Sequence, residues 1–362
     1  HQTGNNSGVI HSGLYYTPGS KKANNCVKGR HELVQFAREN KVTHDVCGKV
    51  VVATTSKEIK FLEKIYKNGI ANNTEGITKI NPDEIREIEP EVDGVAGIWV
   101  PCTGIIDFVE ATQKMINVAQ GINSSSEVYL GHNVSAIQQD GELKKIITSK
   151  KVFTSRYLIV CGGLQADRLA KSDGVELDER VVGFRGDYYK LKDSSRHKVN
   201  NLIYPVPNPE FPFLGVHLTR MTDGSIECGP NAVYSFKREG YNKFSFNLRD
   251  TVESLFFIGT LKLFINHWKF GLNEYKRSFS KRLFLRDLQK LVPSLKLDDL
   301  EKGKSGGRAM ALGNDGEVID DFKIVKNNKN IHVLNAPSPA ATACLAIADN
   351  IVLAFAKHFS LN

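Results

Sequence analysis

The chain has no closely spaced pair of cysteines. Its six cysteines are scattered and form no CxxC pair, which excludes a zinc knuckle and argues against a disulfide framework. This usage is typical of a reducing compartment. The six are Cys26, Cys47, Cys102, Cys161, Cys228 and Cys344.

Long uninterrupted apolar runs are also lacking. The run 255–268 is broken by Lys262 and His267, and the uncharged stretch 331–348 contains two prolines. Because a membrane span needs about 20 consecutive apolar residues, the sequence predicts no spanning helix. Internal repeats and low-complexity segments are absent as well.

Familiar phosphate and nucleophile motifs are missing or misplaced. No GxGxxG occurs in the chain, and the Gly303-Lys304-Ser305 triplet is not a Walker A motif, because Asp298 stands where a glycine is required. The segment 303–307 spells GxSxG, but a strand and not a helix is predicted after it. A hydrolase of the nucleophile-elbow type is therefore excluded.

What remains is an ordinary globular composition. The 362 residues are 41% hydrophobic and 24% charged, with a formal net charge of +8. At ~100–200 residues per domain, we expect about two domains and a large core. No nucleic-acid recognition motif accompanies the positive charge, so we expect no nucleic-acid partner.

The pattern of elements predicts a mixed α/β protein. We expect a helix over 108–119 with Asp107 as N-cap, and strands over 127–130, 134–138 and 143–148. An apolar, buried strand over 157–161 then runs into Gly162-Gly163 and a helix over 165–171. A strand, two glycines and a helix are the arrangement of a nucleotide-binding unit, although the glycines are also explained by tight packing.

The pattern changes after residue 180. Aromatic and polar alternation over 181–231 predicts an antiparallel sheet, followed by helices over 250–267 and 273–291. Strands over 307–312, 322–325 and 331–335 and a helix over 340–359 complete the chain. We therefore expect two domains that interleave in sequence.

The opening segment 1–13 gathers small, amide and hydroxyl residues around two histidines, His1 and His11. Small residues let a backbone approach a flat or anionic ligand closely. A plain surface loop has the same composition, and His11 alone has either a structural or a basic role.

Three arginines are candidates for binding an anion: Arg185, Arg220 and Arg308. Each is also explained by a structural ion pair. Arg308 is the least easily explained in that way, because it stands in an apolar, glycine-flanked strand.

The segment 276–290 is a basic amphipathic helix with one acid, Asp287. Such a helix suits the surface of an anionic membrane, and a solvated face of the fold is the alternative. We expect at most a peripheral membrane contact there.

Six segments together resemble the L-2-hydroxyglutarate dehydrogenase family, FAD-dependent members of the D-amino-acid oxidase and glycerol-3-phosphate dehydrogenase superfamily. The likeness covers essentially the whole chain in order. The segments are His1–Tyr16, Ile203–Pro207, Phe211–Thr219, Gly229–Val233, Phe236–Tyr241 and Asn335–Thr342.

The resemblance implies a Rossmann-like FAD-binding domain interleaved with an antiparallel-sheet substrate domain. The FAD-binding domain would comprise 1–43, 107–178 and 303–362, and the substrate-binding domain 44–106 and 179–302. The implied reaction is oxidation of L-2-hydroxyglutarate to 2-oxoglutarate, with hydride transfer from the substrate C2 to flavin N5.

The resemblance also implies site residues and no metal. His11 is the first choice for the base and His217 the second; Arg308 would bind the carboxylate next to C2, and Arg185 or Arg220 the distal one. Tyr188 and Thr219 are further substrate contacts. FAD would be held by Gly4, Asn5, Asn6, Ser7, Gly8, Val9, His11, Val134, Cys161, Gly162, Gly163, Pro339, Ala340, Ala341 and Thr342.

The sequence departs from the family in two places. The first GxGxxG unit is absent, and we expect it to occupy roughly 30–50 residues upstream of His1; Met310 stands where a polar residue is usual. Two alternatives therefore stay open: a flavin enzyme for another small carboxylate or amine, and a non-catalytic fragment without its pyrophosphate clamp. The electron acceptor, a quinone or a carrier protein, is not specified, and the implied location is mitochondrial, with cytoplasmic as the alternative.

Overall fold

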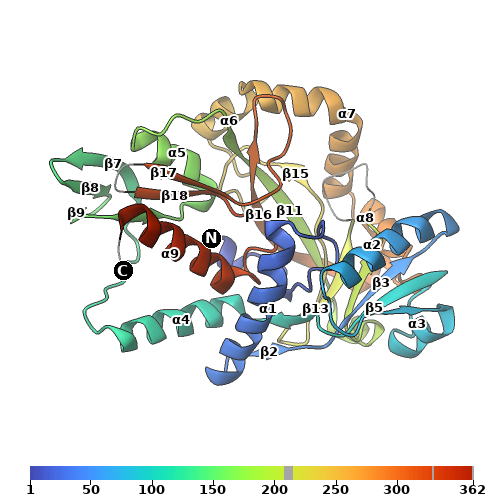
Figure 1. Ribbon diagram of the computed structural model, residues 1–362. Coiled ribbons are helices and arrows are strands. Elements are labelled where there is room, and N and C mark those ends of the chain that lie inside the picture. Colours follow the sequence, from blue (N-terminus) through green and yellow to red (C-terminus); the bar gives the residue numbers. More distant parts are fainter. Residues whose placement is uncertain (208–214, 328–329, 361–362) are drawn as a thin grey trace.

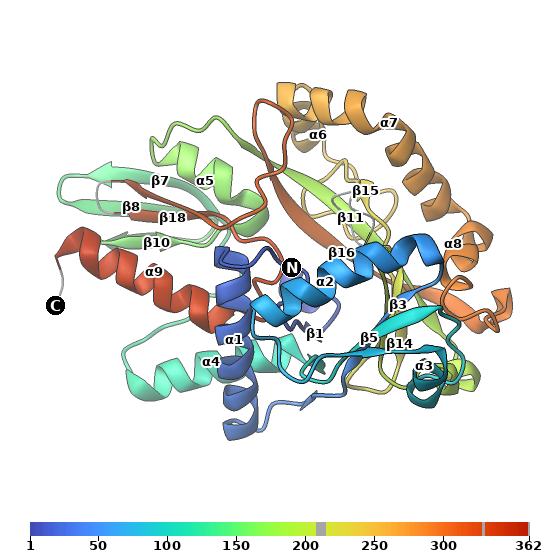
Figure 2. The same cartoon turned by 45° about the vertical axis from the view of Figure 1, so that its right-hand side comes forward.

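The computed structural model describes residues 1–207, 215–327 and 330–360. Residues 211–214 of the segment Phe211–Thr219 lie outside the described residues. The chain forms two regions with the N-terminus between them: one around β7–β10, β17 and β18, the other around β3, β5 and β11–β16 (Figures 1 and 2). The fold is mixed α/β, as predicted.

The larger region is built on a nine-stranded sheet in which β16 pairs with β11. Every pairing is antiparallel except the parallel pair β12–β3. In spatial order the strands are β15 (Val233–Tyr234), β11 (Arg180–Leu191), β14 (Ile226–Gly229), β13 (His217–Arg220), β12 (Leu202–Pro205), β3 (Lys49–Ala53), β5 (Ala96–Val100) and β4 (Thr78–Ile80), with β16 (Leu300–Leu312).

The two faces of this sheet bury different partners. Because side chains alternate along a strand, Val50 and Val52 face one side, against α8 (Lys281–Leu288) and its Phe284. Val51 faces the other side, toward Leu14 and α2 (Ile59–Ala71). Helix α3 (Pro82–Ile88) packs Ile85 on the first side.

The smaller region contains a parallel pair and a meander. β10 (Leu158–Val160) runs parallel to β18 (Asn330–Asn335), which pairs antiparallel with β17 (Lys323–Asn327). β7 (Val134–Asp140), β8 (Leu143–Thr148) and β9 (Val152–Ser155) form the meander. The predicted turn at Asp140-Gly141 joins β7 and β8, and α5 (Ala166–Ser172) follows β10.

Helices α1 (Lys21–Glu39) and α9 (Cys344–Phe359) cross beside the N-terminus (Figure 2). They approach so closely that a Cβ at Gly29 would lie 2.6 Å from Ala343 Cα, so only glycine fits there. Helix α4 (Phe108–Ile122) begins at the predicted cap Asp107, whose side chain accepts from two backbone N–H groups. β1 (Val9–Ile10), β6 (Gly104–Ile106) and β2 (His44–Asp45) form a small sheet near α1.

Several predicted elements need correction. Residues 127–130 form no strand, and Ile159 of the predicted buried strand is exposed. In place of the two long helices after residue 250, the structure has α6 (Leu248–Leu255), α7 (Ile258–Phe279) and α8, with a kink in α7 at His267, where the first predicted helix ends. A new helix begins because Ser280 accepts from Leu283 N and caps α8. The domain boundary expected at 303 stays a prediction; residue 303 lies within β16, which pairs with β11.

The basic segment 276–290 turns much of its apolar side inward. Phe284, Leu285 and Leu288 are buried in the core, and Arg277 and Lys290 pair with Asp287. In the described part of the chain, no helix combines the length and apolar character that crossing a bilayer requires.

Candidate active site

One face of the large sheet gathers polar side chains. Leu202 pairs with both Lys49 and Thr219, so the side chains of Lys49 and Thr219 point to the same face of the sheet. Because side chains alternate along a strand, Tyr204, two residues after Leu202, and His217, two residues before Thr219, point to that face too. The contacts agree: the Tyr204 and His217 rings stack with centroids 4.0 Å apart, and Tyr204 hydrogen-bonds with Thr219. Polar residues from three strands thus meet on one face of the sheet.

His217 is held in a defined protonation state. Its Nδ1 lies 3.1 Å from Gly215 O, and because a carbonyl oxygen only accepts, Nδ1 carries the hydrogen. The Nε2 atom is therefore a lone-pair acceptor, and it is buried without a hydrogen-bond partner. Burial, together with the nearby Arg308, His11 and Lys49, lowers the pKa of His217 to about 3 despite the bond to Gly215 O, so the ring is neutral near pH 7.

His11 approaches the same place from the N-terminal segment. It follows β1, and its backbone N donates to Thr342 Oγ1 at 3.0 Å, while the Thr342 hydroxyl donates to Val9 O at 3.2 Å. Burial and the neighbouring Lys49 ammonium lower the pKa of His11 to about 3. The structure thus brings both predicted histidines together as neutral imidazoles.

Arg308 reaches this face from β16. Its charge lowers the pKa of His217 and opposes the rise that burial causes in Tyr188 and Tyr204. Tyr188 is buried, and its pKa is raised to about 12. Of the predicted substrate contacts, Arg308, Tyr188 and Thr219 therefore lie around His217.

The other two predicted arginines have carboxylate partners of their own. Arg185 is buried, with Nε 2.7 Å from Asp187 Oδ1, and it also donates to Asn242 O. Arg220 lies 2.6 Å from Asp45 Oδ2 at the edge of the sheet. Their role in binding substrate stays a prediction.

Sequence reasoning did not single out Lys49, Tyr204 or Tyr15. Lys49 is 1% exposed, with its Nζ 4.6 Å from the ring centroid of Tyr15 and 5.0 Å from that of Tyr204. The signal in the sequence is a lysine that opens the apolar strand Lys49–Ala53. A charged residue at a position fully covered by the fold is unusual.

The opening loop is shaped by close backbone approaches. Gln2 Nε2 donates to Gly307 O at 3.1 Å, and a Cβ at Gly306 would lie 2.6 Å from Asn5 O. Gly8 has φ +66° and donates its N–H to Asn6 Oδ1. Gly163 faces Gln2 and also has a positive φ, +51°.

The opening loop lies against Gly163, Gly306 and Gly307, and this arrangement suits the binding of FAD. A flat ring system needs small residues that its faces can approach, and the loop 4–8 supplies them. The segment Pro339–Thr342 precedes α9 directly and reaches the opening loop through the Thr342 hydroxyl, which accepts from His11 N. The buried, unpartnered His217 Nε2 faces the same surroundings. The residues that would hold FAD here are Gly4–Val9, His11, Gly162, Gly163 and Pro339–Thr342.

Two predicted cofactor contacts lie farther along the smaller region. Val134 pairs with Thr148 in β7, and Cys161 is an exposed free thiol directly after β10. Within the described residues, no backbone hydrogen bond links Val134 to the opening loop. Both cofactor assignments stay predictions. Among the residues that the structure describes, no cluster of three His, Cys, Asp or Glu side chains could hold a metal ion.

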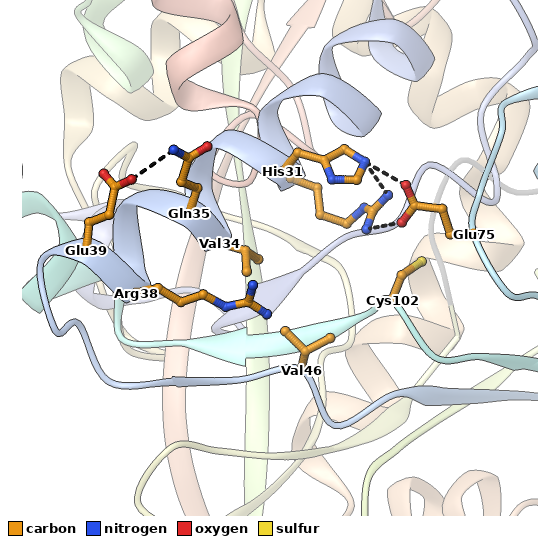
Figure 3. Close-up of a pocket in the computed structure, with 9 residues that line it drawn as sticks. His31, Val34, Gln35, Arg38, Glu39, Val46, Glu75 and Cys102 are labelled. Carbon is orange, nitrogen blue, oxygen red and sulfur yellow. Dashed lines mark hydrogen bonds and ion pairs between the residues drawn. The ribbon is translucent and has the colours of Figure 1, made fainter.

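A separate cavity lies elsewhere in the described part of the chain. A cavity of about 650 Å³ opens along α1, and Figure 3 shows His31 directed at Glu75 on its wall. The Arg30 Nη1 to Glu75 Oε2 distance is 3.0 Å and the His31 Nε2 to Glu75 Oε1 distance is 2.7 Å. None of the predicted site residues lines it.

The fold and the site define a class of flavoprotein. The family model described as FAD dependent oxidoreductase matches residues 1–352, and the chain belongs to this family. A solved structure of L-alpha-glycerophosphate oxidase from Mycoplasma pneumoniae with FAD bound has the same fold, with a TM-score of 0.78 at 22% identity, covering 98% of this chain and 85% of that one.

Within that family the chain belongs to the L-2-hydroxyglutarate dehydrogenases. It is 46% identical to the enzyme of that name from Indibacter alkaliphilus, over 99% of this chain and 90% of the relative. It is 40% identical to the mitochondrial L-2-hydroxyglutarate dehydrogenase of Nematostella vectensis, over 100% of this chain and 83% of the relative.

Proposed function

We propose that this protein oxidises L-2-hydroxyglutarate to 2-oxoglutarate with FAD as cofactor. The observation that carries the proposal is the neutral His217, whose unpartnered Nε2 lies buried near Arg308 on the same sheet face. The substrate carries its hydroxyl group next to a carboxylate, and the site has a proton acceptor, His217 Nε2, near a cation, Arg308. Membership of the L-2-hydroxyglutarate dehydrogenases supports the choice of this 2-hydroxy acid.

The side chains of the site have separate tasks. Arg308 binds the carboxylate next to C2, and His217 Nε2 accepts the hydroxyl proton as the C2–O bond becomes a carbonyl. FAD, when bound, supplies the two-electron acceptor for the hydride that leaves C2. The oxidation thus removes one proton through the imidazole and one hydride from carbon.

His217 is preferred to His11 as the base because its tautomer is fixed by Gly215 O. His11 is the second candidate, since it is also neutral and lies beside Thr342. The low pKa of His217 rises when a substrate carboxylate offsets the nearby positive charges, which strengthens the base only in the complex.

The experiment is an anaerobic titration of the purified holoenzyme, followed at the flavin absorption band. L-2-hydroxyglutarate should bleach the band, while D-2-hydroxyglutarate and glycerol 3-phosphate should leave it unchanged. Bleaching by a different small hydroxy acid or amine, with none by L-2-hydroxyglutarate, would reject the substrate and keep the flavoenzyme class.

We also propose that the protein docks on an anionic membrane through α7. Ile265, Trp268 and Leu272 are exposed on this helix, and its exposed charged residues, Lys262, Lys269 and Lys276, are all basic. The one acid of α7, Glu274, is buried beside Arg277. Ile265 and Trp268 flank the kink that α7 makes at His267, and exposed apolar side chains beside positive charge suit anionic lipid headgroups.

Vesicle cosedimentation tests the docking surface. Ile265→Glu combined with Trp268→Glu should abolish binding to vesicles rich in anionic lipid, whereas Arg286→Glu, an exposed change on α8, should weaken it only slightly. Equal loss in both would place the contact on the segment 276–290. The acceptor of the electrons stays unassigned, and a mitochondrial location is proposed by analogy with the Nematostella relative.

A further inference from the structure

We propose that Lys49 binds the distal carboxylate of the substrate and thereby makes the site selective for a dicarboxylate. The inference rests on the proposed function, because it names a second contact for the same substrate. It moves the distal contact from Arg185 or Arg220 to a lysine on β3.

Lys49 differs from every other buried cation in the described chain. Six Lys and Arg residues are buried there, and five of them pair with a carboxylate. Lys49 is the sixth, and its contacts are the rings of Tyr15 and Tyr204. The five pairs are Lys22–Asp320, Arg30–Glu75, Lys144–Asp173, Arg185–Asp187 and Arg238–Asp167.

The titratable groups around Lys49 carry no negative charge near pH 7. Burial raises the pKa of the Cys26 thiol to about 12 and also raises that of Cys102. The phenol pKa values of Tyr15 and Tyr204 are raised by burial too. A buried ammonium without an anion is unfavourable, so an incoming carboxylate gains more here than at a paired arginine.

The strand order places Lys49 and Arg308 on opposite sides of His217. β13, which carries His217, is separated from β3 by β12 and from β16 by β14 and β11. Both charges nevertheless lower the pKa of His217. A molecule whose hydroxyl lies at His217 Nε2 therefore has one cation on each side, which matches a chain with a carboxylate at both ends.

The test compares two substrates on the Lys49→Met holoenzyme. L-2-hydroxyglutarate has a distal carboxylate, and L-2-hydroxyvalerate has the same reacting carbon without it. We expect KM for L-2-hydroxyglutarate to rise roughly 10- to 100-fold, the loss of one charge-assisted contact, with a smaller change in kcat. KM for L-2-hydroxyvalerate and the flavin content should stay unchanged, and Lys49→Arg should restore part of the loss.

Other results would overturn the inference. Equal losses on both substrates would assign Lys49 to the shared half of the molecule or to the cofactor, and an unchanged KM for L-2-hydroxyglutarate would remove it from the site. If Lys49→Met does not fold, Lys49→Gln is measured in the same way. Failure of the wild-type enzyme to oxidise L-2-hydroxyglutarate would instead reject the proposed function.

The matched control is Lys144→Met. Lys144 is equally buried but lies 2.7 Å from Asp173 in the smaller region. This variant should keep the wild-type ratio of the two KM values. A shift in that ratio as large as that of Lys49→Met would show that loss of any buried lysine perturbs the site.

Discussion

Two groups of buried charge in this molecule are built in opposite ways. In the smaller region, the Asp173 carboxylate accepts from Lys144 Nζ at 2.7 Å, from His332 Nε2 at 2.8 Å and from Asn330. Burial alone raises the pKa of Asp173, but these hydrogen bonds outweigh it and hold the pKa below its usual range. Every charge in this group has a partner that offsets the loss of water.

On the sheet face around His217, the Lys49 ammonium is buried without a carboxylate partner. Lys49 is covered by neutral rings and thiols, and its pKa is lowered by burial to about 8. The two histidines are neutral for the same reason. The difference teaches that a buried cation paired with a carboxylate has a structural role here, whereas a buried cation without a carboxylate indicates a ligand.

The largest effect should come from removing the proposed base. His217→Asn should lower kcat about 10²- to 10⁴-fold, because the hydroxyl proton loses its acceptor. Stopped-flow reduction of the flavin by L-2-hydroxyglutarate measures it. His332→Asn is the control from the paired group and should change stability but not kcat; a normal kcat in His217→Asn would transfer the role to His11.

Arg308→Lys should reduce kcat/KM for L-2-hydroxyglutarate roughly 10- to 100-fold, since lysine cannot bind a carboxylate with two parallel hydrogen bonds. Arg185→Lys should leave kcat/KM within a few-fold, because Asp187 already neutralises that cation. Steady-state kinetics on both variants distinguishes the two arginines. An unchanged value in Arg308→Lys would remove Arg308 from the site.

Replacing each of the two buried lysines, Lys144 and Lys49, by Met should change the free energy of unfolding in opposite directions. Lys144→Met leaves Asp173 without its cation and should cost about 3–5 kcal/mol of the free energy of unfolding. Lys49→Met removes a charge whose pKa falls from 10.5 to about 8 and should stabilise the fold by up to roughly 3 kcal/mol. Urea denaturation of both variants is the measurement, and destabilisation by Lys49→Met would contradict the comparison.

The pH dependence sharpens the comparison. Lys49 is charged below its pKa of about 8 and neutral above it, so kcat/KM for L-2-hydroxyglutarate should fall as pH rises through about 8. Burying the charged ammonium also lowers the free energy of unfolding. Between about pH 8 and 10.5 the folded protein releases the Lys49 proton while the unfolded chain still holds it, so the free energy of unfolding rises with pH over this range. Lys49→Met should lose this alkaline limb of kcat/KM, and a limb that persists in the variant would assign it to another group.

The sequence predicted helices, strands and turns well where a few neighbouring residues specify them. The Asp107 cap, the Asp140-Gly141 turn and β8 follow from short segments and were confirmed. The predicted end of a helix at His267 coincides with the kink in α7, whereas the boundary between α7 and α8 was missed, because it depends on the cap that Ser280 forms in the fold. Val134 and Cys161 remain predictions.

The sequence by itself determined the class of fold, the cofactor type and the segments that form the opening loop, because long motifs and element order are properties of the chain. Only the tertiary structure decided which groups lie beside each charge. Arg185 and Arg308 look alike in sequence, yet Asp187 lies beside one of them and His217 beside the other. Lys49 gave a weak sequence signal because burial without a partner depends on residues from β3, β12, β13 and the N-terminal segment, which meet only after folding.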